Sequence, residues 1–265
     1  GKSAALLVGD MWRWQMAGDG KREDLPRAWR QMIRWLVADV AHELRTPLSN
    51  IQGYLEAVKD GLLEPNEETI DTIYQQAVHL SQLVEDLRLL AQVEGGSLGL
   101  NIAPDSLPEV LRRSVEAFRA RAEAEGVELS MYTPADFPLV TMDRTRIAQV
   151  VANLLENAIR HTPSGGRVEV RLGEAAIAKA TVTVSDSGEG IPTQELPNIF
   201  ERFHRVDPSR ARSTGGAGLG LTIAKQLVEA HGGTIHAESD LGKAAGSYSN
   251  SPWAMWGCES DNRDS

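Results

Sequence analysis

One histidine stands in a helical stretch whose neighbouring side chains could support nucleophilic chemistry. His42 lies within DVAHELRTPL, residues 39–48, with Glu43 beside it and Thr46 four residues on. A neutral imidazole on a rigid helix, close to a carboxylate and a hydroxyl, can act as a nucleophile. The ordinary alternative is a solvated surface histidine. Pro47 argues against that alternative, because it removes the hydrogen bond to the Glu43 carbonyl and is costly in a purely structural helix.

Three other segments have the residue types that bind a nucleotide. Asn153 and Asn157 are neighbours on a predicted helix over 144–161, and amide oxygens suit Mg²⁺. Arg160 extends the same polar side and could reach a phosphate. Asp186 opens DSGEGIP after a strand, where a carboxylate can accept from an exocyclic amine and glycines let a flat ring approach.

The third segment is GGAGLGL, residues 215–221, which opens into a helix and can present backbone N–H groups to phosphate. Taken singly, each segment has an ordinary reading as solvated amides, an Asp-Gly turn or a glycine-rich turn. Their occurrence together, in this order, indicates a nucleotide site.

Two helices with apolar residues at alternating spacings of four and three must position His42. The first set is Val37, Ala41, Leu44, Leu48, Ile51, Leu55, Val58 and Leu62, and the second is Ile70, Ile73, Ala77, Leu80, Val84, Leu87 and Ala91. These heptad seams predict an antiparallel hairpin with a turn at 64–68. His42 lies one residue past a seam position, so we expect it to be exposed. A lone hairpin leaves much of its seam in solvent, which favours pairing with a second copy as a four-helix bundle. The alternative is packing on the second domain.

The pattern changes near residue 100. Helices are expected at 107–125, 144–161 and 219–230, and strands at 127–131, 167–172, 180–186 and 234–238. Helices mixed with antiparallel-looking strands predict a two-layer α/β sandwich.

These segments resemble the motifs of two-component sensor histidine kinases. AHELRTPL, residues 41–48, is similar to their phosphoacceptor box, and NLLENAIRH, DSGEG, FERF and GAGLGL are similar to the N, G1, F and G2 boxes of their ATP-binding domain. The resemblance covers roughly residues 36–243. It implies a dimerisation and histidine phosphotransfer domain over 35–96 and a catalytic ATP-binding domain of the Bergerat (GHKL) type over 101–243. Residues 1–34 are left as an upstream linker or signal-relay segment.

The resemblance also implies roles. His42 would be phosphorylated, Glu43 would hold or deprotonate its imidazole, and Thr46 would position water during dephosphorylation of the partner. Asn157 would bind Mg²⁺ with support from Asn153, and Asp186 would read the adenine amine. Phe200 to Gly220 would form a lid over ATP. The residues implied in nucleotide binding are Asn153, Asn157, Arg160, His161, Asp186, Gly188, Gly190, Ile191, Phe203, Gly216, Gly218, Leu219 and Gly220.

The implied function is autophosphorylation of His42 by Mg-ATP in a homodimer, then transfer to an aspartate on a response regulator receiver domain, with phosphatase activity toward that regulator as a further possibility. Two alternatives stay open. One is another ATPase of the same fold, although those enzymes place a glutamate where this chain has Asn153. The other is a non-catalytic dimeric scaffold or phosphatase with an impaired ATP domain.

Composition limits the partners and the compartment. The 265 residues carry a formal net charge of −10, which argues against nucleic acid and anionic membranes as main partners. Cys258 is the single cysteine, which fits a reducing cytosol. No apolar run approaches the roughly 18 residues of a spanning helix. We therefore expect a cytoplasmic, soluble core. A start at Gly1 suggests a piece of a longer protein, and an inner-membrane sensor is a possible parent.

The segment 244–265 departs from the family, which has a final sheet strand of the pattern Gly-Ser-x-Phe-x-Phe-x-Leu-Pro. Inserting one base before the codon of Ala244, with free third bases, turns 244–258 into GSRFLFELPLGHVGV and places a stop codon at Glu259. We hypothesise a single-base deletion, and expect a sheet that lacks its last strand and a disordered tail.

Overall fold

A computed structural model describes residues 24–175, 179–204, 218–239 and 253–256, with side chains described from Val40 onward except at 174–175, 179 and 253–256. The chain divides into two compact units, Gly1–Glu85 and Asp86–Ser265, so the boundary falls inside a helix.

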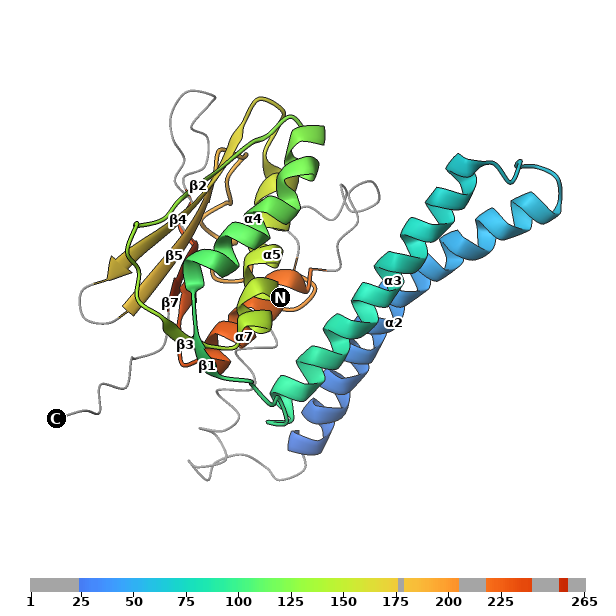
Figure 1. Cartoon of the computed structure of the whole chain (residues 1–265). Coiled ribbons are helices and arrows are strands. Elements are labelled where there is room, and N and C mark those ends of the chain that lie inside the picture. Colours follow the sequence, from blue (N-terminus) through green and yellow to red (C-terminus); the bar gives the residue numbers. More distant parts are fainter. Residues whose placement is uncertain (1–23, 176–178, 205–217, 240–252, 257–265) are drawn as a thin grey trace. The chain divides into compact units, whose positions relative to one another are not determined.

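The first unit is built on two long helices, α2 (Asp24–Lys59) and α3 (Glu67–Glu94), which run antiparallel as a hairpin (Figure 1). Gly61 ends the first helix with a positive φ of 72°. The next helix begins where the Asn66 side chain accepts from the Thr69 backbone N–H at 2.9 Å. The Asn50 amide donates to Gln76 Oε1 at 3.3 Å across the hairpin. The predicted hairpin is confirmed.

The second unit contains a five-stranded sheet in the order β2-β4-β5-β7-β6. Its strands are β2 (Glu128–Tyr132), β4 (Arg167–Ala175), β5 (Lys179–Asp186), β6 (Ile235–His236) and β7 (Trp253–Trp256). A separate small sheet pairs β1 (Ala103–Asp105) with β3 (Val140–Met142). The helices are α4 (Leu107–Ala124), α5 (Arg144–His161) and α7 (Gly220–Ala230).

The helices lie on one face of the sheet, which makes two layers (Figure 1). Strand alternation explains this, because one side of β4 and β5 carries the buried residues Val168, Val170, Leu172, Ala180, Val182 and Val184. The opposite side carries polar residues such as Glu169, Arg171 and Thr183. The core therefore lies between this apolar sheet face and the apolar stripes of α5 and α7, as a two-layer sandwich requires.

Two features of the sheet were not predicted. β2 pairs with β4 in parallel, whereas β4–β5, β5–β7 and β6–β7 are antiparallel, so the sheet is mixed. A parallel pair needs a crossover, and α5 lies in it. The small β1–β3 sheet was also missed.

The expectation of a missing last strand and a disordered tail is wrong for Trp253–Trp256. These residues form β7, which pairs with Thr181–Val184 on one side and with Ile235–His236 on the other. Without it, β5 and β6 would present unpaired backbone groups at two edges, and aromatic residues favour strands. Residues 244–252 and 257–265 lie outside the described part of the chain. Among the helices that are described, none is both long and apolar enough to cross a membrane.

Candidate functional site

His42 is exposed on α2, as its position beside the seam predicted. Thr46 Oγ1 donates to the His42 carbonyl oxygen at 3.2 Å, so one helical turn links the two residues through the backbone. Pro47, which cannot donate to the Glu43 carbonyl, is buried. Glu43 is half-buried. The imidazole is thus open to solvent on a helix with a nearby carboxylate and hydroxyl.

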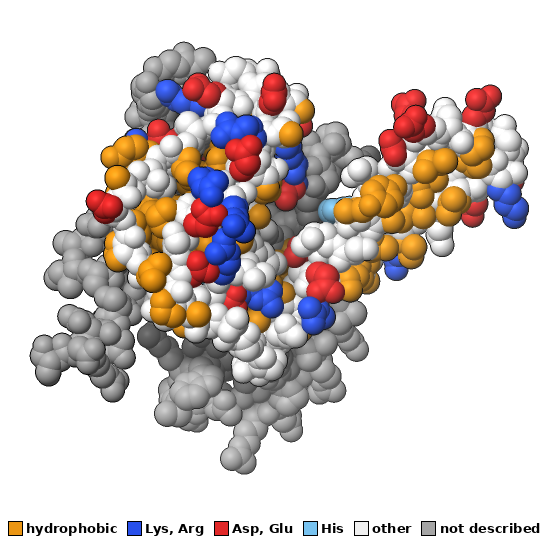
Figure 2. All heavy atoms as spheres, in the orientation of Figure 1, with side chains coloured by type: hydrophobic (Ala, Val, Ile, Leu, Met, Phe, Trp, Pro, Cys, Tyr) orange, Lys and Arg blue, Asp and Glu red, His pale blue; other side chains and the backbone are white. Residues whose placement is uncertain are grey.

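An apolar face runs along the hairpin and is open to solvent (Figure 2). Large apolar side chains that are at least one third exposed are Leu48, Tyr54, Leu55, Leu62, Leu63, Ile70, Tyr74, Val78 and Val84. Five of these nine are predicted seam positions: 48, 55, 62, 70 and 84. The seam alanines Ala77 and Ala91 are exposed too, so seven of the fourteen seam positions whose side chains the structure describes are unburied in the hairpin.

Helix α5, which carries both candidate asparagines, is fixed at its N-terminus by Asp143. Its carboxylate accepts from the backbone N–H groups of Thr145 and Arg146 at 3.0 and 3.1 Å, and from Asn101 at 2.9 Å. Burial alone would raise the pKa of Asp143, but these amide donors and the Arg146 charge lower it below its usual range. Asp143 is thus an ionised N-cap that also ties down the segment before β1.

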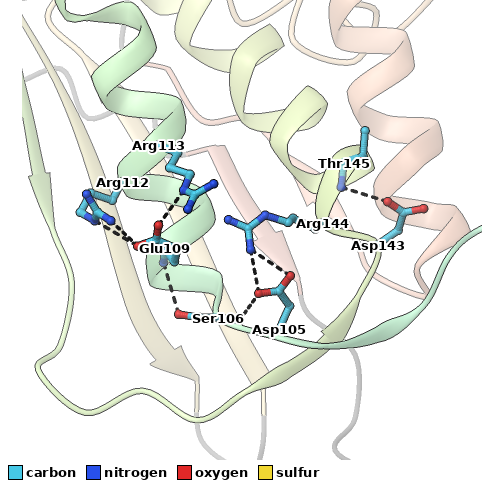
Figure 3. Close-up of polar contacts among 8 residues, drawn as sticks. All are labelled: Asp105, Ser106, Glu109, Arg112, Arg113, Asp143, Arg144 and Thr145. Carbon is cyan, nitrogen blue, oxygen red and sulfur yellow. Dashed lines mark hydrogen bonds and ion pairs between the residues drawn. The ribbon is translucent and has the colours of Figure 1, made fainter.

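Figure 3 shows the neighbouring polar contacts. Arg144 Nη1 lies 3.0 and 3.1 Å from the two carboxylate oxygens of Asp105, and Glu109 of α4 contacts both Arg112 and Arg113. Hydrogen bonds from Arg112 and Arg113 hold the pKa of the Glu109 carboxyl below its usual value. The N-terminal ends of α4 and α5 are therefore joined through Asp105 and Arg144 (Figure 3).

The polar side of α5 includes Asn153, Asn157 and Arg160, all of them half-buried. Asn153 Nδ2 donates to the Gly220 carbonyl oxygen at 2.9 Å. Arg160 Nη2 lies 2.7 Å from Glu156 Oε1, and Arg121 of α4 lies 3.4 Å from the same oxygen. The structure therefore joins the N-box helix to the glycine segment at 220 and to α4.

The G1 segment lies against the C-terminal end of α5. A Cβ built on Gly188 would lie 2.5 Å from the His161 carbonyl oxygen and 2.8 Å from Asp186 Oδ1, so only glycine fits there. The Gly188 backbone N–H donates to Asp186 Oδ1 at 2.9 Å. Burial raises the pKa of Asp186, although that hydrogen bond and His161 act in the other direction. Gly190 has a positive φ of 76°, and the Ile191 N–H donates to Ser239 Oγ at 2.7 Å.

His161 extends the site beside this loop. Its Nδ1 lies 3.7 Å from Glu189 Oε1. Burial and the Arg160 charge lower the pKa of His161, while Glu189 and Asp186 oppose the shift. These surroundings therefore favour the neutral form of the imidazole.

The glycine segment meets the F-box residues by backbone contact. The Phe203 N–H, in a residue with a φ of 57°, donates to the Gly218 carbonyl at 3.2 Å. A Cβ on Gly218, where φ is 66°, would lie 3.0 Å from Phe203 Cα. Leu219 is buried and precedes α7, whose first turn receives no side-chain cap within the described residues. Gly216 lies outside the part of the chain that the structure describes.

Sequence reasoning missed three residues that support this arrangement: Asp143, His231 and Glu156. The His231 ring is buried; its Nε2 accepts from the Asp143 N–H at 3.1 Å and its Nδ1 lies 2.7 Å from the Leu227 carbonyl oxygen. Asp143 had a signal, because an aspartate directly before a helix is an N-cap candidate. His231 had none. Within the described ranges, no group of three His, Cys, Asp or Glu side chains could hold a metal ion.

Two family models match the chain. The one described as "His Kinase A (phospho-acceptor) domain" matches residues 32–96. The one described as "Histidine kinase-, DNA gyrase B-, and HSP90-like ATPase" matches residues 142–248. Together they include His42, both asparagines, Asp186 and the glycine segment.

Relatives and solved structures agree with these matches. The signal transduction histidine-protein kinase BaeS of Escherichia coli (strain K12) is 40% identical over 208 residues, which are 78% of this chain and 44% of BaeS. The histidine kinase AdeS of Acinetobacter baumannii is similar in structure, with a TM-score of 0.64 and 30% identity over 83% of this chain and 98% of that one. Full-length ShkA in complex with AMPPNP is also similar in structure, with a TM-score of 0.60 and 25% identity over 84% of this chain and 44% of ShkA. The chain spans less than half the length of the curated relatives it matches.

Proposed function

The chain belongs to the sensor histidine kinase family, and from this we propose that it phosphorylates its own His42 with ATP and passes the phosphoryl group to an aspartate of a response regulator. The observation that carries most weight is the presence, in one chain, of an exposed His42 in the phosphoacceptor box and of an ATP domain in which α5, residues 186–191 and the start of α7 come together.

The described residues fit an adenine nucleotide. Asp186 has a half-buried carboxylate with one backbone donor, as expected of a group that accepts from an exocyclic amine. Gly188 lets the segment 186–191 pack against the end of α5, because any side chain there would collide with the His161 carbonyl oxygen. At the other end, the uncapped first turn of α7 offers N–H groups to phosphate.

Mg²⁺ is part of the proposal and would neutralise charge on the phosphates. Asn157 would supply an amide oxygen to it. One amide oxygen would suffice, because Mg²⁺ binds mainly through substrate phosphates and water in such sites.

The reaction is a transfer from one acceptor to the next. An imidazole nitrogen of His42 attacks the γ-phosphorus, the bond to the bridging oxygen breaks, and ADP leaves. Glu43 would hold the ring or accept its proton, and positioning with charge neutralisation would supply most of the rate. The phosphoramidate then gives its phosphoryl group to the receiver aspartate. Thr46 would orient water when that aspartyl phosphate is hydrolysed.

We further propose that the active form is a homodimer, because the exposed apolar face of the hairpin needs a partner surface and a second copy offers the same heptad pattern. The domain limits 35–96 and 101–243 are part of this proposal.

Another ATPase of the same fold is disfavoured, since Asn153 stands where those enzymes use a glutamate to activate water. A non-catalytic scaffold is the remaining rival.

The direct test is incubation of the purified chain with Mg²⁺ and γ-labelled ATP beside His42→Ala. We expect acid-labile, base-stable label on the wild type and none on the variant. His79→Ala, which changes a histidine elsewhere on the hairpin, is the matched control and should keep its label. Absence of label on a folded, dimeric wild-type chain would favour the scaffold.

A further inference from the structure

Asn153 touches the first residue of α7 as well as facing the nucleotide side of α5. Its Nδ2 donates to the Gly220 carbonyl oxygen at 2.9 Å across 67 residues of sequence. A Cβ built on Gly220 would lie 3.7 Å from Asn153 Cγ, so the amide group packs against the backbone there. The Asn153 side chain therefore holds the start of α7 to α5.

Helix α7 is attached to α5 at its other end as well. The Asp143 N–H donates to His231 Nε2 at 3.1 Å, and His231 caps the last turn of α7. Between the two ends, Ile223, Leu227 and Val228 are buried. Asn153 and Asp143 thus fix both the position and the direction of α7 relative to α5.

The first turn of α7 depends on this contact more than an ordinary helix start would. Leu219 stands at the N-cap and its side chain cannot accept a hydrogen bond, so within the described residues no side chain caps that turn. Thr222 is buried, and its hydroxyl has no hydrogen-bond partner in the same part of the chain. Among the described residues, the Asn153 side chain donates a hydrogen bond to the backbone of this turn, at the Gly220 carbonyl.

We infer that Asn153 is a positioning residue for phosphate binding: it holds the first turn of α7 so that the backbone N–H groups face the phosphates, independently of any metal ion. This inference rests on the proposed function, since it assumes that ATP binds between α5 and α7. It assigns Asn153 a task different from the support of Mg²⁺ that the family resemblance implies.

The test is the affinity for ATP with and without Mg²⁺ in Asn153→Asp. Aspartate keeps an oxygen that can serve a metal but cannot donate to the Gly220 carbonyl, which it would instead repel. We expect the dissociation constant, measured by displacement of a fluorescent ATP analogue, to rise by about tenfold, as the loss of one hydrogen bond predicts. The factor should be the same in excess Mg²⁺ and in EDTA. Hydrogen exchange at residues 220–222 should quicken, while exchange at 226–228 stays unchanged.

Two more variants complete the design. Gln149→Glu adds the same charge one turn earlier on α5, beside Arg146, and should leave both dissociation constants unchanged. In Asn153→Ser the side chain is too short to reach Gly220 and adds no charge. This variant should show the same loss of ATP affinity, and it replaces Asn153→Asp if the aspartate variant does not fold. A loss confined to Mg²⁺ would assign Asn153 to the metal and overturn the inference, as would unchanged affinity in EDTA. A wild-type chain that binds no ATP would instead contradict the proposed function.

Discussion

Asp186 is an acid in an environment that disfavours its charge, and it holds that charge without a cationic partner at close range in the described structure. Burial raises its pKa, and the main compensation is one hydrogen bond from the Gly188 N–H. A carboxylate in such surroundings costs stability, and groups of this kind are frequent at binding sites.

Asp186→Asn should stabilise the nucleotide-free ATP domain at neutral pH while weakening ATP binding. The pKa of Asp186 is higher in the folded state than in the unfolded state, so its ionisation lowers the free energy of unfolding at a pH above the folded-state pKa. This cost disappears below the unfolded-state pKa, where the carboxyl is protonated in the folded and the unfolded protein alike. The gain in melting temperature should therefore be a few degrees at pH 7 to 8 and shrink as the pH falls. Thermal unfolding across pH measures it.

Asp136→Asn removes the same charge at an exposed position and serves as the comparison for this experiment. A wild type and an Asp186→Asn variant with parallel stability profiles would contradict the assigned environment of Asp186.

Single residues also show where sequence reasoning stops. The exposure of His42 followed from its place beside a heptad seam. The bond from Asn153 to Gly220 could not be predicted, because it joins residues whose distance depends on how two helices pack. The same applies to His231, which reads as a surface residue at a helix end and is buried against Asp143.

At the scale of elements, the hairpin makes a prediction about association. Leu55 is 52% exposed on the apolar face, so in a homodimer it would be buried in both copies. Leu55→Asp should convert the dimer to monomer, because each leucine contributes about 1.5–3 kcal/mol on burial and symmetry doubles the loss. Light scattering coupled to size exclusion reports the mass.

Ser49→Asp introduces the same charge on another side of α2, at an exposed position, and should leave the mass unchanged. A monomeric wild type would instead favour the alternative in which the apolar face packs on the second domain.

Elements differ in how well their sequence defines them. Helix α5 was predicted with its observed limits, 144–161, because its apolar residues recur at helical spacing over several turns. β1 and β3 have three residues each, too few for a period to show. The parallel pairing of β2 with β4 is set by the crossover through α5, and alternation within a strand carries no information about direction.

At the scale of the whole molecule, the segment 244–265 decides how complete the ATP domain is. Ending the chain after Lys243 should lower the unfolding temperature and promote aggregation, because β5 and β6 would both lose the partner that β7 provides. Replacing 244–258 by GSRFLFELPLGHVGV should raise that temperature above the value for the chain as it stands. Differential scanning calorimetry of the three proteins measures both effects.

The hypothesis of a single-base deletion remains a prediction, and sequencing of the source gene tests it independently. An intact frame that codes for Ala244 onward would remove it. The strand at Trp253–Trp256 was not predicted, because four residues are too few to show an alternating pattern.

The position of β7 also determines the order in which this protein can be made. The hairpin joins residues close in sequence, so it can form early during synthesis, in keeping with the speed of local contacts. The sheet cannot, because β7 follows β6 in the chain yet lies between β5 and β6. When the ribosome has just finished β6, the edges of β5 and β6 that β7 will pair with are therefore unpaired. We expect a chaperone to bind the nascent ATP domain most readily at that stage.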